Sequence, residues 1–455
     1  MALPGPDSPD PDQLLEELQL FGMRLGLASC RQLLQALGAP QISVPSVLIA
    51  GTNGKGSTAA LLAAMGTAAG YRTGLYTSPH LESVEERIRL DGSAIPRPAL
   101  GGLLAEVLDE ARRSYPDPIT YFEALTVAAY LHFARMKVDL AVLEVGLGGR
   151  LDATNAGEPV LSVLSPIGLD HQEHLGSTLP EIAREKAGIL RPGIPAVAWI
   201  DDPSALATVR GIAAELGSPF QEVPAEVKWQ RHGSLGWSGQ YLDLATPRQR
   251  LSLALPFLGE HQLVNLSLAV RAAEVLETRG FPRLQGQALV DGVAACRWPG
   301  RLEVVELPGG RRVLLDAAHN SDGARRLRSF LDFLDGDLDL LFGVLADKDH
   351  EAILGALAPR FRRIVLTRPE SSRARPPEEL AHFVARDGSA SVEASLPAAL
   401  DEALETLANG GASTLVACGS IYLVGPVRTL LRRRFGVPAP AAEILTGPEG
   451  QTSGP

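Results

Sequence analysis

The sequence predicts an α/β protein with a parallel-type central sheet and a second, smaller α/β domain. Three observations support this fold class. Short apolar runs alternate with helix-forming stretches, several runs end in glycine or in a polar side chain, and helical periodicity stops at residues 295–303 (ACRWPGRLE), where short strands begin. Strands that alternate with helices are typical of parallel sheets, because parallel neighbours need a crossover connection.

The first strand and helix flank a glycine-rich loop. Residues 46–50 (SVLIA) form an apolar run with β-branched members, as buried strands do, and residues 55–69 are small or helix-forming. Glycines allow backbone N–H groups of the loop to turn toward an anion, and the helix directs its positive end to the same place. The loop and the helix start supply Gly51, Gly54, Lys55, Gly56, Ser57 and Thr58.

This loop differs from the common phosphate loop, G-x-x-x-x-G-K-[ST]. Ile49 stands at the position of the first glycine, and Gly56 separates Lys55 from the hydroxyl of Ser57. An ordinary glycine-rich turn is the alternative, but a lysine and hydroxyls within one loop favour phosphate binding. A P-loop kinase is disfavoured, because its hydroxyl follows the lysine directly.

The remaining elements continue the alternation. In the first domain we expect strands at 73–76, 139–145 and 160–165, helices at 121–136, 181–190 and 259–276, and strands or loops at 221–250. In the second we expect strands at 313–316, 338–345, 364–367 and 414–418. The predicted boundaries are a disordered N-terminus at 1–12, domains at 13–298 and 299–436, and a disordered tail at 437–455.

Composition and charge exclude several classes of function. The net charge of −11 argues against a nucleic-acid surface, which is normally basic, so an anionic substrate needs local Lys and Arg side chains. No apolar run reaches membrane-spanning length, and the acidic, proline-rich N-terminus is unlike a signal peptide. The three cysteines lack zinc spacing, so we expect reduced, buried thiols. We expect a cytoplasmic protein, a monomer, that binds neither nucleic acid nor membranes.

Polar side chains stand at the ends of three predicted strands. Ser78 follows one strand, Glu144 interrupts the apolar run LAVLEV, and Asp170 and His171 follow a third. Open α/β sheets bind ligands at these strand ends, so a hydroxyl, a carboxylate and an imidazole could converge there on Mg²⁺. A buried carboxylate also needs a cation or another partner. Imidazole is an unusual ligand for Mg²⁺, and each residue taken singly could equally be a satisfied polar group in a loop.

Short motifs occur along the chain in a fixed order: AGTNGKGST, YTSPHL, ERI, TYFE, LEVGLGGRLDATN, GLDH, REKAGI, WPGRLE, LDAAHN, DKD and CGS. This ordered set, from about residue 20 to about residue 435, resembles the folylpolyglutamate synthase/dihydrofolate synthase family, a branch of the Mur ligase superfamily. The resemblance implies a P-loop-containing ATPase domain of the Mur ligase type and a Rossmann-like C-terminal domain. It also implies that GTNGKGS is this superfamily's own phosphate loop.

The resemblance implies a ligase that joins a pteroate or folate carboxylate to the amine of L-glutamate. A carboxylate is a poor electrophile, so ATP would phosphorylate it to an acyl phosphate, from which the amine displaces phosphate; metals, lysine and backbone donors stabilise the charge. The implied ligands are ATP, Mg²⁺ at two sites, L-glutamate, dihydropteroate and reduced folates. The implied ATP-site residues are Gly54, Lys55, Gly56, Ser57, Asn265, Arg301 and Asp316, and the implied Mg²⁺ ligands are Ser78, Glu144, His171 and Lys186.

Other residues are implied to contact the two substrates that are joined. His319 and Ser420 are candidates for placing glutamate, with His319 also a catalytic candidate beside Lys55 and Lys186. Segments that contact the pterin in bifunctional bacterial members match Thr120, Tyr121, Phe122, Glu123, Leu151, Asp152 and Ala153. This match favours both synthase activities, although such residues at a helix start are also common packing and capping elements.

Several alternatives remain open. The chain could be a folylpolyglutamate synthase only, or another Mur-type ligase that acts on peptidoglycan nucleotides. A nucleotide-binding regulator without catalysis would be expected to lack Lys55, Glu144 or Lys186, and all three are present.

Lys186 has two interpretations. From spacing alone it is one charge on a solvated helix face beside Glu181 and Glu185. The resemblance implies instead a lysine carbamylated by CO₂, whose anionic carbamate could hold the second Mg²⁺ between the γ-phosphate and the substrate carboxylate. A lysine with a lowered pKa is a neutral amine and can add CO₂.

Overall fold

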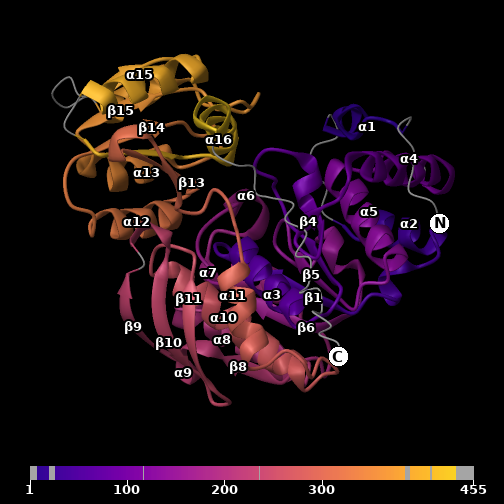
Figure 1. Cartoon of the computed structure of the whole chain (residues 1–455). Coiled ribbons are helices and arrows are strands. Elements are labelled where there is room, and N and C mark those ends of the chain that lie inside the picture. Colours follow the sequence, from indigo (N-terminus) through magenta and orange to yellow (C-terminus); the bar gives the residue numbers. More distant parts are fainter. Residues whose placement is uncertain are drawn as a thin grey trace, which may run out of the picture.

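The computed structural model describes residues 8–19, 26–115, 117–234, 236–384, 390–409 and 412–436. It contains three sheets, of eight, three and six strands, and the chain passes from the first two to the third near residue 300. We call the part before this passage the N-terminal unit and the part after it the C-terminal unit; the latter is drawn in orange and yellow in Figure 1. The predicted α/β fold class, with parallel strands in two sheets, is confirmed.

The eight-stranded sheet has the order β4-β3-β2-β5-β1-β6-β7-β8. Its strands are β1 (Ser46–Ala50), β2 (Thr73–Tyr76), β3 (Ile88–Leu90), β4 (Ser93–Ala94), β5 (Leu140–Glu144), β6 (Pro159–Leu164), β7 (Ala196–Ala198) and β8 (Phe220–Glu222). The strands from β2 to β8 in this order are parallel, whereas β3 and β4 add antiparallel to the edge. Four carboxyl ends, of β2, β5, β1 and β6, therefore lie side by side.

Helices cover both faces of this sheet. The helices of the N-terminal unit are α1 (Pro11–Gln19), α2 (Ala28–Ala36), α3 (Lys55–Ala68), α4 (Arg97–Ser114), α5 (Tyr121–Arg135), α6 (Gln172–Leu175), α7 (Leu179–Ala187), α8 (Pro203–Glu215), α9 (Val223–Glu226), α10 (His261–Glu277) and α11 (Gln287–Ala295). Successive strand residues enter opposite cores: Leu143 faces the core that contains α4 and α5, and Val142 faces the core that contains α3 and α10. This alternation buries β5 on both sides, as the apolar run predicts.

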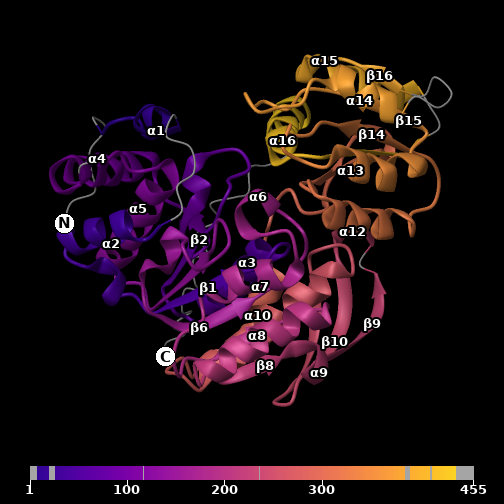
Figure 2. The ribbon, with the colours of Figure 1, turned by 180° about the vertical axis from the view of Figure 1, so that it is seen from behind.

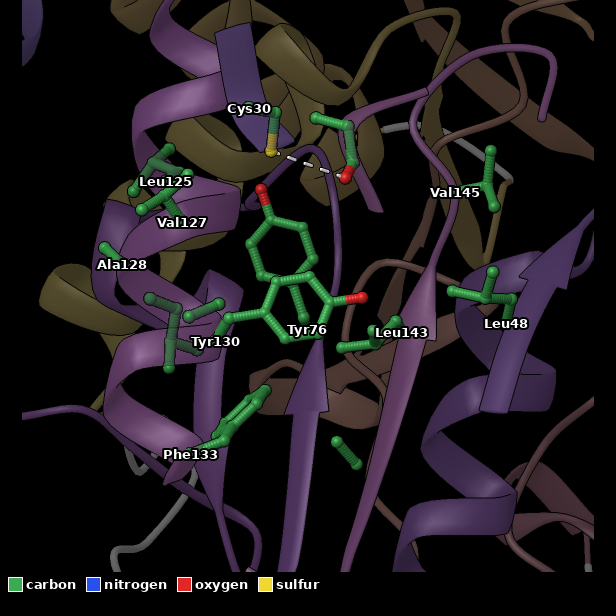
Figure 3. Packing of buried hydrophobic residues seen from close by; sticks show 14 of the residues in the cluster. Cys30, Leu48, Tyr76, Leu125, Val127, Ala128, Tyr130, Phe133, Leu143 and Val145 are labelled. Carbon is green, nitrogen blue, oxygen red and sulfur yellow. Dashed lines mark hydrogen bonds between the residues drawn. The ribbon is translucent and has the colours of Figure 1, made fainter. Parts of the chain in front are cut away.

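The core beside α5 is anchored by aromatic residues. Figure 3 shows Tyr76 of β2 and Tyr130 and Phe133 of α5 within the space between sheet and helix, and all three side chains are buried. The Tyr130 hydroxyl donates to the Thr154 carbonyl oxygen at 2.8 Å. Cys30 is buried in the same cluster, and Cys296 and Cys418 are also free and buried, as expected from the sequence.

The stretch at 221–250 belongs mainly to a small antiparallel sheet. Its strands are β9 (Lys228–Ser234), β10 (Gln240–Ala245) and β11 (Arg250–Leu255), in the order β11-β10-β9. Leu242, Leu244 and Leu253 on this sheet are fully buried in the core that also contains α10 and α11. The sheet therefore packs on the side of the N-terminal unit that carries α10 and α11 (Figure 1).

The C-terminal unit has a six-stranded sheet of order β12-β13-β17-β14-β15-β16, parallel except for β12. Its strands are β12 (Glu303–Glu306), β13 (Arg312–Asp316), β14 (Leu338–Phe342), β15 (Arg363–Leu366), β16 (Ala390–Val392) and β17 (Thr414–Cys418). Its helices are α12 (Ser321–Leu331), α13 (His350–Leu357), α14 (Pro377–Val384), α15 (Leu396–Asn409) and α16 (Ile421–Phe435). The first three helices cover one face and the last two cover the other.

Regular structure begins earlier in the chain than the sequence predicts. Helix α1 begins at Pro11, so regular structure starts within the segment 1–12 that was expected to be disordered. Arg97 fixes this start by ion pairs of 2.7 Å to Asp10 and 2.6 Å to Asp12. Residues 1–7 and the predicted tail at 437–455 lie outside the described residues. In the part of the chain that the structure describes, no helix combines the length and apolarity needed to cross a membrane.

Candidate active site

A pocket of about 190 Å³ lies between the two units, at the carboxyl ends of β1, β2, β5 and β6. Helix α6 lies at the same junction in both ribbon views (Figures 1 and 2). The predicted residues that line this pocket are Gly54, Lys55, Gly56, Ser57, Ser78, Glu144, His171, Lys186, Asn265, Arg301, Asp316 and His319. The structure thus gathers them from both units, although they are spread over the sequence.

The glycine-rich loop is packed too closely for larger residues. Gly51 and Gly54 have φ values of 152° and 88°. A Cβ on Gly51 would come within 1.9 Å of Ser165 Oγ, and a Cβ on Gly54 within 2.2 Å of Asn265 Oδ1. Helix α3 begins directly after Gly54, and the first turn of a helix leaves its N–H groups without intrahelical acceptors. The loop therefore presents donors and a positive helix end to the pocket, as an anion site requires.

Buried polar atoms beside this loop suit a polar ligand. Thr58 Oγ1, Ser165 Oγ and Asn265 Oδ1 are buried and have no hydrogen-bond partner within the described ranges. Of the three residues, only Asn265 lines the pocket, so a polar molecule bound there would recover the roughly 1–3 kcal/mol that this unsatisfied oxygen costs. The Lys55 ammonium, half-buried at the start of α3, donates to the Thr52 carbonyl oxygen at 3.2 Å.

Glu144 is a buried carboxylate that faces this loop. It is the last residue of β5 and is 7% exposed, and its Oε2 accepts from the Ser78 N–H at 3.1 Å. Burial raises the pKa of Glu144, and the charge of Lys55 opposes that rise. No ion pair to Glu144 occurs among the residues described here. A carboxylate in this position is stabilised by a cation.

Asp170 and His171 lie where the two units meet. The Asp170 carboxylate pairs with Lys348 Nζ at 3.1 Å and accepts from Asn320 Nδ2 at 3.0 Å, both from the C-terminal unit. Burial by itself would raise the pKa of Asp170. The charges of His171 and Lys348 outweigh burial and hold this pKa well below its usual range. Burial lowers the pKa of His171 to about 4, so its imidazole is neutral near pH 7, as a metal ligand must be.

Lys186 is buried, so of its two interpretations the solvated helix face, which spacing alone favoured, is wrong. It is 4% exposed on α7, and its Nζ donates to the Gly51 carbonyl oxygen at 2.7 Å. Burial, followed by the charge of Lys55, lowers the pKa of Lys186 to about 7. A substantial fraction of this side chain is therefore a neutral amine near pH 7, directed at the glycine-rich loop.

The C-terminal unit completes one wall. The Asp316 carboxylate, at the end of β13, accepts from the Leu302 and Ala318 N–H groups at 2.9 Å each, and burial raises its pKa. His319 Nδ1 lies 2.8 Å from the Ala317 carbonyl oxygen, and burial lowers the pKa of this histidine. Arg301 lies at the start of this unit and also lines the pocket.

The predicted pterin-contacting residues lie outside the pocket lining. Thr120 and Glu123 form the capping box that starts α5, and Asp152 caps the helix η3 (Ala153–Ala156) while accepting from the Leu147 N–H at 2.8 Å. Phe122 and Asp152 stand behind the pocket wall, because a Cβ on Gly146 would come within 2.6 Å and 3.2 Å of them. Ser420 caps α16. These contacts are structural and leave the predicted ligand roles of these residues, and of Tyr121, Leu151 and Ala153, as predictions.

The lining also includes residues that the sequence did not single out. These are Asn53, His261, Gln262 and Arg326, among others, while Lys348 reaches the pocket edge through Asp170. The motif DKD was a signal for Lys348, and the start of α10 in GEHQ was a signal for His261. In the described ranges, no three His, Cys, Asp or Glu side chains form a ready metal site. Mg²⁺ often takes only one or two protein carboxylates with water and phosphate, so this arrangement is compatible with the predicted ligands.

Comparisons with known proteins agree with this arrangement. Residues 49–273 match the Mur ligase middle domain, and residues 300–421 match the Mur ligase glutamate ligase domain. The chain is similar to a Bacillus subtilis protein named dihydrofolate synthase/folylpolyglutamate synthase, with 36% identity over 74% of this chain and 79% of that one. It is also 36% identical to a Haloferax volcanii protein named probable bifunctional folylpolyglutamate synthase/dihydropteroate synthase, over 92% of this chain. The match spans about half (50%) of the length of that relative.

Solved structures are similar over nearly the whole chain. Escherichia coli FolC in complex with DHPP and ADP has a TM-score of 0.83 and 31% identity, over 94% of this chain and 99% of that one. A bifunctional folylpolyglutamate synthase/dihydrofolate synthase with Mn, AMPPNP and L-glutamate bound has a TM-score of 0.81 and 30% identity, over 95% and 100%.

Proposed function

Because this chain belongs to the folylpolyglutamate synthase/dihydrofolate synthase family of Mur ligases, we propose that it uses ATP to join L-glutamate to a pteroate or folate carboxylate. One observation carries the proposal. A single pocket combines the glycine-rich loop, the buried Glu144 and Lys186, and residues Arg301, Asp316 and His319 from the other unit. Such a pocket can hold two anionic reactants together, which is the main difficulty of this reaction.

ATP would bind with its phosphates at the first turn of α3. Gly54, Lys55, Gly56 and Ser57 would hold the phosphates, and Asn265, Arg301 and Asp316 would complete the nucleotide site. The unsatisfied Asn265 Oδ1 and the close packing around Gly54 support this assignment. Nucleotides in both solved relatives described above also support it.

Mg²⁺ would be held by Ser78, Glu144 and His171, and a second ion by a carbamate on Lys186. When bound, the ions would neutralise phosphate charge. The buried carboxylate of Glu144, which forms no ion pair with any residue that the structure describes, and the neutral imidazole of His171 support the first site. The lowered pKa and burial of Lys186 support the second. Mn in the structure of a solved relative supports the use of a divalent metal.

In the proposed reaction, the protein would stabilise negative charge on the reactants and would hold the reactants in place. ATP would phosphorylate the substrate carboxylate to an acyl phosphate, and the glutamate amine would then displace phosphate. Lys55 and the N–H groups of α3 would stabilise the negative charge that develops, while His319 and Ser420 would place glutamate. Because the pocket lies between two units, their closure would exclude water from the acyl phosphate.

The pteroate or folate would lie toward α5. The Arg87 guanidinium lies 5.1 Å from the ring centroid of Tyr121, so a positive charge and an aromatic surface occur together beside the predicted segment. Thr120, Phe122, Glu123 and residues 151–153 would form the rest of this site. We propose both synthase activities; folylpolyglutamate synthesis alone is the second candidate.

We also propose that the working unit is a cytoplasmic monomer whose first domain starts with α1 and ends at residue 298 and whose second domain is 299–436. Light scattering of the purified protein would measure the mass directly.

The proposed activity predicts that ATP hydrolysis depends on both other substrates. We expect phosphate release only when L-glutamate is present together with dihydropteroate or tetrahydrofolate, and a product heavier by one glutamyl residue in mass spectrometry. Parallel assays with the two acceptors distinguish a bifunctional enzyme from a folylpolyglutamate synthase. A UDP-sugar peptide serves as the control, and turnover of that peptide instead would assign the chain to another Mur-type reaction.

Replacing Glu144 by Gln is expected to reduce ligation by at least about 10²-fold, because the side chain keeps its shape but loses the charge that would attract Mg²⁺. High Mg²⁺ should restore only part of the activity. Initial rates over a Mg²⁺ titration measure both effects. Glu306→Gln, at an exposed position on β12, is the control. Wild-type rates for Glu144→Gln at ordinary Mg²⁺ would show that Glu144 is a structural carboxylate.

A further inference from the structure

Three polar side chains of helix α16, in the C-terminal unit, converge on one carboxylate of the N-terminal unit. Glu82, four residues after Ser78, accepts from Arg432 Nη1 at 2.8 Å and from Thr429 Oγ1 at 2.6 Å. It also accepts from Arg428 Nη1. The Glu82 and Arg428 side chains are only 15% and 4% exposed. We call Glu82 and its three partners the Glu82 latch.

Arg428 joins three parts of the chain. Besides Glu82, its Nε donates to both carboxylate oxygens of Glu303 at 2.9 Å, and Glu303 Oε2 accepts from the Gly300 N–H at 2.9 Å. The guanidinium therefore ties the loop after β2, the passage between the units and α16 together. Neither Glu82 nor Arg428 lines the pocket, so direct contact with substrate is not their role.

The end of the loop that contains Glu82 is fixed by hydrogen bonds to one carboxylate. Glu86 of the short helix η2 (Val84–Arg87) accepts from the N–H groups of Leu81 at 3.0 Å, Glu82 at 3.1 Å and Ser83 at 3.1 Å. Helix α16 lies directly against the same loop, since a Cβ on Gly425 would come within 1.8 Å of the Leu81 carbonyl oxygen. A displacement of α16 would therefore displace this loop as a block.

At its other end the loop reaches the pocket. The Ser78 N–H donates to Glu144 Oε2, the buried carboxylate described above. Figures 1 and 2 both place α16 on the side of the C-terminal unit that faces the N-terminal unit. The connection thus runs from α16 through Glu82 and the loop to Ser78 and Glu144.

We propose that Glu82 and Arg428 are positioning residues that hold the two units together and set Ser78 against Glu144. This inference rests on the proposed function for its catalytic consequence, but the contact itself does not. Removing either charge breaks the nearly buried ion pair between the units. Arg428 then keeps only Glu303, or Glu82 keeps only Arg432 and Thr429, and the joined arrangement is weakened. Loss of the latch should therefore lower kcat, because fewer molecules have the two units joined, and should change the KM of each substrate much less.

Kinetics of the full-length protein test the catalytic part. For Glu82→Gln and Arg428→Gln we expect kcat to fall at least about tenfold, with KM for ATP changed less than about threefold and the Mg²⁺ concentration for half-maximal rate raised. In the double variant the loss should be smaller than the product of the two single losses, because each single variant already breaks the ion pair that Glu82 and Arg428 share. Thr429→Val, which removes one hydrogen bond only, should give a smaller effect and guards against loss of folding.

Arg434→Ala is the matched control on the same helix, because Arg434 is half exposed and pairs with the exposed Asp401. It should leave kcat unchanged. A stable Glu82→Gln protein with wild-type kcat and Mg²⁺ dependence would overturn the proposal, and so would independent losses in the double variant.

A distance measurement tests the latch without any activity. Ile42 and Phe333 are 74% and 77% exposed on the N-terminal and C-terminal units, so cysteines at these positions can carry a pair of fluorescent dyes. Glu82→Gln should shift energy transfer toward longer distances, and Arg434→Ala should not. Unchanged transfer would overturn the latch. If the wild type does not ligate glutamate, the proposed function is wrong. The distance measurement still tests the latch in that case, because it does not depend on activity.

Discussion

Replacing Lys55 by alanine is expected to abolish ATP-dependent ligation while the fold remains intact. Lys55 is half-buried as the first residue of α3, and its ammonium contacts only the Thr52 carbonyl oxygen in the described structure. Its loss should therefore cost little stability. In the proposed reaction its charge stabilises the phosphates, and removing such a group typically costs at least about 10²-fold in rate.

The measurement combines initial ligation rates with thermal unfolding. We expect the variant to keep less than a few percent of the activity and to melt close to the wild type. Lys228→Ala, at an exposed position that starts β9, should behave as wild type in both assays. Activity above a few percent in Lys55→Ala would show that the glycine-rich loop is not the phosphate site.

Elements with fully buried strands were predictable from the sequence. Residues 46–50, 73–76 and 414–418 coincide with β1, β2 and β17, because a strand covered on both faces is a continuous apolar run. The short edge strands β3, β4 and β16 carry partly exposed side chains and gave no such run. The small antiparallel sheet was ambiguous for the same reason.

Helix α4 shows how packing overrides local preference. Residues 97–114 include Gly101 and Gly102, which disfavour a helix, and no helix was expected there. In the structure a Cβ on Gly101 would come within 1.9 Å of the Pro9 carbonyl oxygen. The glycine is therefore explained by the close approach of the segment that leads into α1, which the sequence alone does not reveal.

The candidate site, like the fold, was predictable from the sequence only in part. The glycine-rich loop and the polar residues at strand ends were predictable because parallel strands bring their carboxyl ends to one edge. Contacts between the units were not, since Asp170 and Lys348 are separated by 178 positions and Glu82 and Arg428 by 346. The burial of Lys186 also depends on where α7 packs, and the charged residues beside it in the sequence favoured the opposite interpretation.

Replacing Lys186 by alanine is expected to leave almost no ligation activity. The side chain is buried with its Nζ 2.7 Å from the Gly51 carbonyl oxygen, and its pKa is lowered to about 7. A neutral amine adds CO₂ to form a carbamate and releases one proton, which turns a cation into a two-oxygen anion. An ammonium at this position would repel a metal ion, whereas a carbamate would attract one. The proposed second Mg²⁺ therefore requires the modified form.

Three measurements distinguish the carbamate from a simple buried lysine. Short carboxylic acids such as acetate should partly restore Lys186→Ala, because they fill the vacated space with a carboxylate. Lys186→Arg, which keeps the positive charge but cannot form the carbamate, should stay inactive. The wild type exposed to ¹³C-labelled bicarbonate should show a carbamate signal in NMR that Lys186→Ala lacks. An absent signal together with near-normal activity of Lys186→Ala would return this lysine to a structural role, in which its hydrogen bond to Gly51 holds α7 against the loop.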